Sequence, residues 1–141
     1  MKLLFLCTGN SCRSQMAEGL ARHYGGEWLE VYSAGTNPTA LHPLTVEVMR
    51  EIGIDITGQY AKGLEHVPAE VDLVVTVCDQ AAEACPLFLG APAVQHWPLP
   101  DPAAATGSLE EITAEFRKVR DDLRKRVRAL LVSLVSPAPT P

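Results

Sequence analysis

Residues 2–15 read KLLFLCTGNSCRSQ, and this stretch decides how the rest of the chain is interpreted. The apolar run at 2–7 is short and bounded by polar residues, which is typical of a strand buried in a parallel sheet. A small polar loop begins after Cys7 and extends to Arg13. From 14 to 24, apolar residues recur with the spacing of a helix, and two glycines end it. The stretch therefore predicts a strand, a tight loop and a helix in direct succession.

The rest of the chain continues this alternation of strands and helices. Such alternation predicts an α/β fold, here with a four-stranded, mostly parallel sheet and helices on both faces. One catalytic domain is expected to span 1–135, and the proline-rich tail at 136–141 is expected to be disordered. Ser108 and Glu111 form a capping box at the start of the last helix. Further strands are expected at 30–34, 71–77 and 93–97, and further helices at 43–52 and 108–135.

Composition excludes several classes of protein. The 141 residues carry a formal net charge of −5, whereas nonspecific nucleic-acid binding needs a basic face. No stretch approaches the roughly 20 apolar residues of a membrane span. The four cysteines form no Cys-x-x-Cys pair, so a structural zinc site is not expected. We expect a cytoplasmic monomer with no membrane or nucleic-acid partner. In the reducing cytosol, cysteines are more often buried, metal-bound or catalytic than paired in a disulfide framework.

The loop between the first strand and the first helix has the composition of an anion cradle. Successive backbone N–H groups converge there, and the helix dipole adds partial positive charge. Gly9 permits close backbone approach, and Asn10 tolerates left-handed conformations while bonding the loop to itself. Arg13 supplies a fork that matches two oxygens of a tetrahedral oxyanion. The predicted oxyanion-binding loop consists of Thr8, Gly9, Asn10, Ser11, Cys12 and Arg13.

Cys7 lies in the same positive field, so its pKa is expected to be lowered and its thiolate populated. Ser14, at the helix start, can donate a hydrogen bond to that thiolate or to the leaving sulfur. The alternative interpretation makes Cys7 a buried strand-end cysteine and Arg13 a surface residue. The combination of strand, Gly-Asn loop, Arg-Ser and helix favours a nucleophile aimed at a bound oxyanion. Cys12 is expected to be a small packing residue.

The motif CTGNSCRS at 7–14 resembles the phosphate loop of the low-molecular-weight protein tyrosine phosphatase family. The resemblance extends over nearly the whole chain, and implies that family's fold. It implies that Cys7 is the nucleophile, that Arg13 binds the oxyanion, and that Asp101 is the general acid. The further matching motifs are Ser33-Ala34-Gly35, Gly53-Ile54-Asp55-Ile56 and Asp101-Pro102.

Three features depart from a tyrosine phosphatase of this family. The chain carries a distal pair, Cys78 and Cys85. It has three alanines at 103–105, where those phosphatases usually have aromatic residues that hold a phenyl ring. It has Gln15 where they usually have proline. All three features are similar to the thioredoxin-coupled arsenate reductases, which share the fold, and so imply reduction of arsenate to arsenite.

This resemblance implies a relay of three thiols. Cys7 forms an adduct with arsenate, Cys78 attacks the Cys7 sulfur so that arsenite leaves, and Cys85 then attacks Cys78. Thioredoxin reduces the resulting Cys78–Cys85 disulfide. Seven positions correspond to about 10 Å of helix, whereas a disulfide needs Cα atoms within about 7 Å. The segment 79–86 is therefore expected to bend or unwind on oxidation, as a redox switch.

Two other functions remain open at this point. One alternative is a phosphatase acting on phosphotyrosine or small phosphomonoesters, in which the distal cysteines take no part. The other is a non-enzymatic redox sensor, although such a sensor needs no oxyanion fork. No tightly bound cofactor and no metal are required by any of these functions. By resemblance to arsenate reductases, a potassium ion is expected near Asn10, Glu18 and Ser33.

Overall fold

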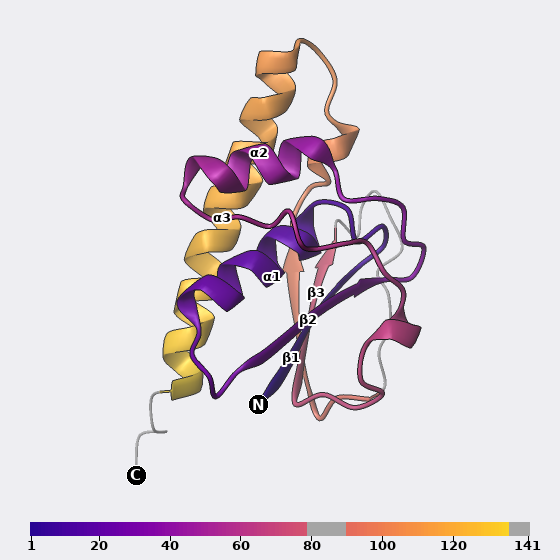
Figure 1. Ribbon diagram of the computed structural model, residues 1–141, viewed down its shortest axis with the longest axis vertical. Coiled ribbons are helices and arrows are strands. Elements are labelled where there is room, and N and C mark those ends of the chain that lie inside the picture. The colour runs from indigo at the N-terminus through magenta and orange to yellow at the C-terminus, as the bar shows by residue number, and fades with distance from the viewer. Residues whose placement is uncertain (79–89, 136–141) are drawn as a thin grey trace.

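The computed structural model describes residues 1–78 and 90–135, and four strands within these ranges form one parallel sheet (Figure 1). The order across the sheet is β2-β1-β3-β4, and each neighbouring pair is parallel. The expected four-stranded sheet is confirmed. The strands are β1 (Lys2–Cys7), β2 (Glu30–Gly35), β3 (Leu73–Cys78) and β4 (Ala93–Pro98).

The two faces of the sheet are covered differently (Figure 1). The α-helices of the described ranges share one face: α1 and α3 pack on the sheet, and α2 packs against both. The 3-10 helix η1 and the chain that follows it cover the other face, over Leu4, Leu6 and Val74. The helices are α1 (Arg13–Tyr24), α2 (Pro43–Glu51), η1 (Leu64–His66), η2 (Pro102–Ala104) and α3 (Leu109–Val135).

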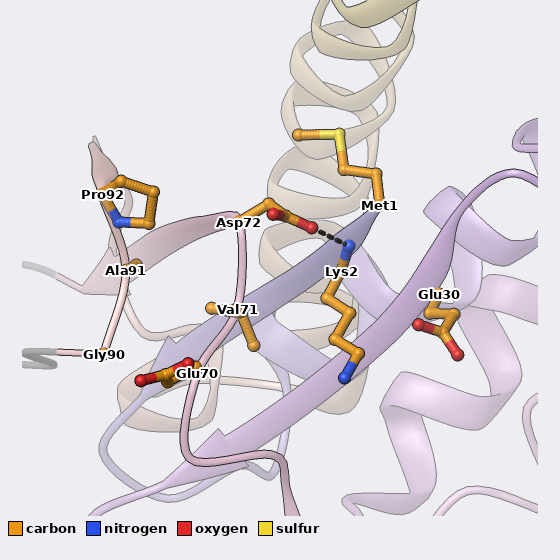
Figure 2. Close-up of a pocket in the computed structure, with 9 residues that line it drawn as sticks. All are labelled: Met1, Lys2, Glu30, Glu70, Val71, Asp72, Gly90, Ala91 and Pro92. Atoms are coloured by element: carbon orange, nitrogen blue, oxygen red, sulfur yellow. Dashed lines mark hydrogen bonds between the residues drawn. The ribbon is translucent and has the colours of Figure 1, made fainter.

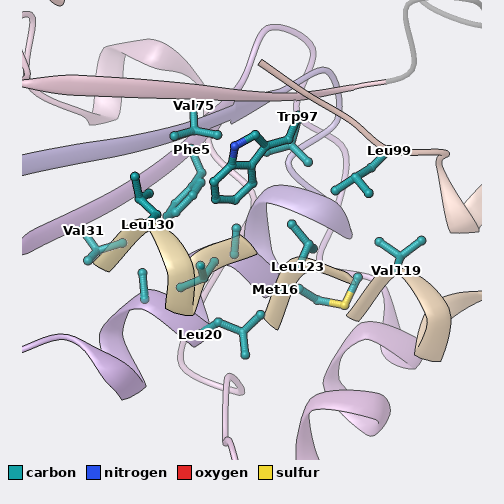
Figure 3. Packing of buried hydrophobic residues seen from close by; sticks show 14 of the residues in the cluster. Phe5, Met16, Leu20, Val31, Val75, Trp97, Leu99, Val119, Leu123 and Leu130 are labelled. Atoms are coloured by element: carbon teal, nitrogen blue, oxygen red, sulfur yellow. The ribbon is translucent and has the colours of Figure 1, made fainter. Parts of the chain in front are cut away.

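The main core lies between the sheet and the helices (Figure 3). Phe5 and Trp97 are in contact there, with ring centroids 5.9 Å apart. Leu20 of α1 and Leu123 of α3 face them. Full burial of one such side chain stabilises the fold by about 1.5–3 kcal/mol. The strands are thereby fixed against the helices, so the loops at their carboxyl ends leave from a rigid platform.

Local signals in the sequence account for most element boundaries. The capping box at the start of α3 forms as predicted, since Glu111 N donates to Ser108 Oγ at 3.1 Å and Ser108 N to Glu111 Oε1 at 3.3 Å. The prediction of β3 over 71–77 was wrong by two residues at its start. Val71 N bonds Gly90 O, and Asp72 caps the amino end of β1, so the strand begins two residues later.

A cavity of about 710 Å³ lies at the amino ends of β1 and β3 (Figure 2). Asp72 Oδ2 accepts a hydrogen bond from Lys2 N there, at 2.7 Å. Of the predicted site residues that the structure describes, none lines this cavity. In parallel sheets, ligands bind beyond the carboxyl ends of the strands, and the predicted site lies at that opposite edge.

Some predictions fall on residues that the structure does not describe. Cys85, the whole of the proposed switch at 79–86 and the tail at 136–141 lie outside the described ranges. Within those ranges, no helix is both long and apolar enough to cross a bilayer.

Candidate oxyanion-binding site

A pocket of about 230 Å³ opens at the carboxyl end of β1, where the loop leads into α1. Gly35, at the end of β2, lets this loop pass closely, because a Cβ atom there would overlap Thr8 O and lie 2.9 Å from Asn10 N. The pocket thus combines the predicted loop with chain segments that are distant in sequence. Its lining residues are Cys7, Thr8, Gly9, Ser11, Cys12, Arg13, Asn37, Thr39, Asp101 and Ala103.

Cys7 lies at the base of the pocket as a free thiol, with 2% of its surface exposed. Asn10 N donates to its sulfur at 3.1 Å, and Ser14 Oγ lies 2.8 Å from it. Hydrogen bonds of this kind stabilise negative charge on sulfur. The structure therefore brings the predicted nucleophile together with the donor that was predicted for it.

Asn10 is buried and adopts φ = 49°, the left-handed conformation that its side chain tolerates. Its Nδ2 donates to Ser14 Oγ at 2.8 Å and to Ser33 Oγ at 3.0 Å. Its Oδ1 accepts from Gln15 Nε2 and Lys62 N, both at 3.0 Å. Because Ser14 Oγ accepts a hydrogen bond from Asn10 Nδ2, its own hydroxyl proton is available to donate to the sulfur of Cys7.

Arg13 and Asp101 both line the pocket and lie next to each other. The Arg13 side chain is 4% exposed, donates to Leu99 O at 3.2 Å, and lies 3.8 Å from the Asp101 carboxylate. Asp101 is 41% exposed and accepts from Ala103 N at 3.0 Å, which holds it at the start of η2. A buried cation and an accessible carboxyl group thus face the same small cavity, as the roles of oxyanion ligand and general acid require.

Cys12 differs from Cys7 although both thiols line the pocket. Burial raises the pKa of Cys12 to about 11, against a smaller opposing effect of its hydrogen bonds with Thr45 and Ser11. At neutral pH it is therefore a protonated thiol and a poor nucleophile. This agrees with the packing role predicted for it.

A second layer of polar side chains lies behind the loop. Ser33 Oγ donates to Glu18 Oε1, and Lys62 Nζ lies 3.4 Å from the same carboxylate oxygen and 3.3 Å from Ser33 Oγ. Arg22 binds the other oxygen of Glu18 at 3.0 Å. The structure thus brings together the three residues expected near a potassium ion, Asn10, Ser33 and Glu18, and adds the ammonium group of Lys62.

The segment 59–62 holds these polar side chains in place behind the loop and was not predicted from the sequence. Gln15 Nε2 lies 3.0 Å from both oxygens of Asn10 and donates to Tyr60 O at 2.8 Å. Gln59 Nε2 in turn donates to Gln15 Oε1 at 2.8 Å. The only signal was Gln15 itself, at the position where related phosphatases usually have proline.

Cys78 ends β3, the strand beside β1. The register pairs Leu6 with Thr76, so Cys7 and Cys78 leave the sheet at the same edge. Cys78 is disulfide-bonded, and its sulfur lies 3.9 Å from Nδ1 of His96. The described residues contain no cluster of histidine, cysteine and carboxylate side chains that could hold a metal ion.

Comparisons with known proteins agree with this geometry. Residues 2–138 match the family described as low molecular weight phosphotyrosine protein phosphatase. The chain is 46% identical to an arsenate reductase of Bacillus subtilis over 89% of its own length and 91% of that protein. A solved arsenate reductase in the phosphate binding state is 36% identical, with a TM-score of 0.79 over 94% of this chain and 97% of that one. A thioredoxin-dependent arsenate reductase of Corynebacterium glutamicum is 28% identical, with a TM-score of 0.67 over 94% of this chain and 60% of that one.

Proposed function

This chain belongs to the low molecular weight phosphotyrosine protein phosphatase family, and we propose that it reduces arsenate to arsenite with electrons from thioredoxin. One observation carries the proposal: two adjacent strands end in cysteines of different redox state. Cys7 is a free thiol in the oxyanion pocket, and Cys78 is disulfide-bonded at the same edge of the sheet. The similarity to named arsenate reductases over most of the chain supports the same function.

In the first proposed step, arsenate binds in the pocket with its oxygens on the loop and on Arg13. The Cys7 thiolate attacks arsenic, and an arsenic–oxygen bond breaks. Asp101 donates a proton to the departing oxygen, which leaves as water. The product is a covalent thiol–arsenate adduct, in which arsenic is still pentavalent.

In the second step, the Cys78 thiolate attacks the sulfur of Cys7 and forms a Cys7–Cys78 disulfide. The sulfur–arsenic bond breaks with both electrons on arsenic, so arsenic is reduced to the trivalent state and leaves as arsenite. Cys85 then attacks Cys78 and releases Cys7 as a thiolate. Thioredoxin supplies two electrons to the Cys78–Cys85 disulfide, and the cycle closes.

Phosphomonoester hydrolysis is a second candidate function. Cys7, Arg13 and Asp101 are sufficient for it, and water can replace the distal thiols in resolving the adduct. A related arsenate reductase has been solved in a phosphate binding state, so a site of this type admits phosphate. Hydrolysis of the thiol–arsenate adduct only returns arsenate. The distal thiols are therefore needed for arsenate reduction but not for phosphomonoester hydrolysis.

The test follows arsenate-dependent NADPH oxidation by the purified protein with thioredoxin and thioredoxin reductase. We expect turnover by the wild type and none by Cys78→Ser or Cys85→Ser. Both variants should still hydrolyse p-nitrophenyl phosphate at the wild-type rate, which shows that the pocket is intact. Turnover that survives both substitutions would contradict the relay. A wild type that hydrolyses the ester but leaves arsenate unchanged would identify a phosphatase, and inactivity in both assays would favour a redox sensor.

A further inference from the structure

Lys62 places a positive charge inside the protein, behind the oxyanion-binding loop. Its side chain is only 10% exposed. The ammonium group lies 3.4 Å from Glu18 Oε1, 3.3 Å from Ser33 Oγ and 3.2 Å from Tyr60 O. The Tyr60 ring covers it at 5.0 Å from the ring centroid. Two side-chain oxygens, a carbonyl oxygen and an aromatic face form the surroundings of a bound cation.

The number of protons on each group fixes which partner donates in the hydrogen bonds around Lys62. The one hydroxyl proton of Ser33 goes to Glu18, so the lone pairs of Ser33 Oγ accept from Lys62 and Asn10. In this order both oxygens of Glu18 act as acceptors, Oε1 from Ser33 and Lys62 and Oε2 from Arg22. Glu18 is 4% exposed, and an ionised carboxylate at that depth needs cationic partners. Arg22 supplies one, but its side chain is 54% exposed, whereas Lys62 is enclosed.

The order set by Lys62 continues to the nucleophile. Asn10 uses one Nδ2 proton on Ser33 and the other on Ser14, and Ser14 is then left to donate to Cys7. The backbone N–H of Lys62 also holds Asn10 Oδ1, so residue 62 contacts this asparagine directly and through its side chain. A change at the ammonium group is therefore transmitted through two side chains to the sulfur.

A separate potassium ion does not fit this arrangement. An ion held by Glu18 and Ser33 would compete with the ammonium group for the same oxygen lone pairs and would lie against a like charge. We propose that Lys62 is an internal cation that takes the place of the expected potassium ion and positions Cys7 through Ser33, Asn10 and Ser14. Lys62 is thus a positioning residue. The inference applies equally to reduction and to hydrolysis, because it concerns only the sulfur common to both.

The inference is tested by the reactivity of Cys7, without arsenate turnover. The rate of alkylation by iodoacetamide is measured at Cys7 by mass spectrometry, with Cys12 distinguished by fragment ions. Wild type, Lys62→Ala and the surface control Lys118→Ala are compared in potassium, methylammonium and tetramethylammonium chloride at one ionic strength. The alanine at position 62 keeps both backbone hydrogen bonds of this residue and removes only the ammonium group and its stem.

For the wild type and Lys118→Ala, we expect rates that differ by less than about twofold among the three salts, since exposed charges are screened similarly in each. For Lys62→Ala in tetramethylammonium, we expect a rate about tenfold lower, the usual size of effect for a group that orients a reacting residue. Potassium or methylammonium, which are small enough to enter the vacated space, should restore most of the rate. The melting temperature of this variant should rise in the same two salts.

Three outcomes would overturn the inference: a wild type that requires potassium, a Lys62→Ala variant that reacts normally in tetramethylammonium, or a loss that neither small cation restores. If Lys62→Ala does not fold, Lys62→Met tests the loss of the ammonium group alone, because it retains the apolar stem. In that variant the rate should fall as far, but the occupied volume should prevent recovery in potassium. A normal rate in Lys62→Met would also contradict the inference.

Discussion

Asn10 determines the shape of the pocket more directly than any other loop residue described. Its backbone turns the loop through a left-handed conformation, and its side chain uses both amide protons and both oxygen lone pairs. Its backbone N–H donates to the Cys7 sulfur at 3.1 Å. Asn10 therefore sets the loop conformation, holds the loop through its side-chain hydrogen bonds and stabilises negative charge on the Cys7 sulfur.

Two substitutions separate these contributions. Asn10→Ala should lower the free energy of unfolding by about 3 kcal/mol, since buried partners lose hydrogen bonds and alanine is strained at positive φ. Asn10→Gly removes the same side-chain hydrogen bonds, but glycine tolerates the positive φ. This variant should therefore lower the free energy of unfolding by only about 1 kcal/mol. Chemical denaturation measures both values. If Asn10→Gly were as stable as the wild type, the side-chain hydrogen bonds would contribute nothing net.

The residues of the loop could be predicted from sequence because they are contiguous. The local geometry follows from the motif itself, in which a strand, a glycine, an asparagine, an arginine and a helix succeed one another within a few positions. Lys62 could not be predicted in this way. It lies 44 positions from Glu18, in a segment without helical or strand periodicity, and only the crossing of that segment behind the loop brings the two together.

At the scale of elements, the carboxylate of Glu51 links α2 to α3. Glu51, the last residue of α2, accepts from Arg117 at 2.7 Å and from Arg120 Nη1 at 2.7 Å. Arg120 is buried and also donates to Val48 O at 2.9 Å. The hydrogen bond from Arg117, followed by that from Arg120, lowers the pKa of Glu51 from 4.5 to about 2.

This contact predicts a pH-dependent part of the stability. Because the pKa is lower in the folded state, ionised Glu51 stabilises the fold above pH 4.5, and the contribution is lost as the pH falls toward 2. Its side chain is 37% exposed, so Glu51→Gln should cost only about 1 kcal/mol at pH 7 after allowance for solvent screening. Chemical denaturation at pH 7 and pH 3 should show the difference from the wild type shrinking at the lower pH.

Glu47→Gln is the matched control for that measurement. Glu47 lies on the same helix and pairs with Arg50, but both side chains are 60% exposed. Exposed pairs contribute little, so this variant should stay close to the wild type at both pH values. A difference for Glu51→Gln that stays constant between pH 7 and pH 3 would show that the charge of Glu51 has no part in joining the helices.

Element boundaries followed from sequence wherever a local signal marks them. Pro43 begins α2, and the capping box begins α3. The start of β3 has no such signal, because Val71 has the β-branched character of the strand that follows. The backbone groups of Val71 and Asp72 bond Gly90 and Lys2 instead, and such distant partners leave no trace in the local pattern.

At the scale of the whole molecule, the oxyanion pocket joins parts of the chain that unfold together. Its walls come from the loop after β1, from residues 37–39 after β2, and from Asp101 after β4. The strands that carry these segments share one core with α1 and α3. Because an anion bound across these walls binds the folded state and not the unfolded chain, ligand binding is coupled to global stability.

Oxyanion binding should accordingly raise the melting temperature of the whole protein. A ligand at 100 times its Kd stabilises the folded state by about 2.7 kcal/mol, which corresponds to about 8 °C for a chain of this size. Phosphate and arsenate should both produce this shift in a thermal denaturation experiment, and chloride at equal ionic strength should not. Arg13→Lys keeps the charge but loses the planar fork that matches two oxygens, so most of the shift should disappear. An equal shift in that variant would mean that the anion binds elsewhere or is held by charge alone, and the fork of Arg13 would then have no part in recognising it.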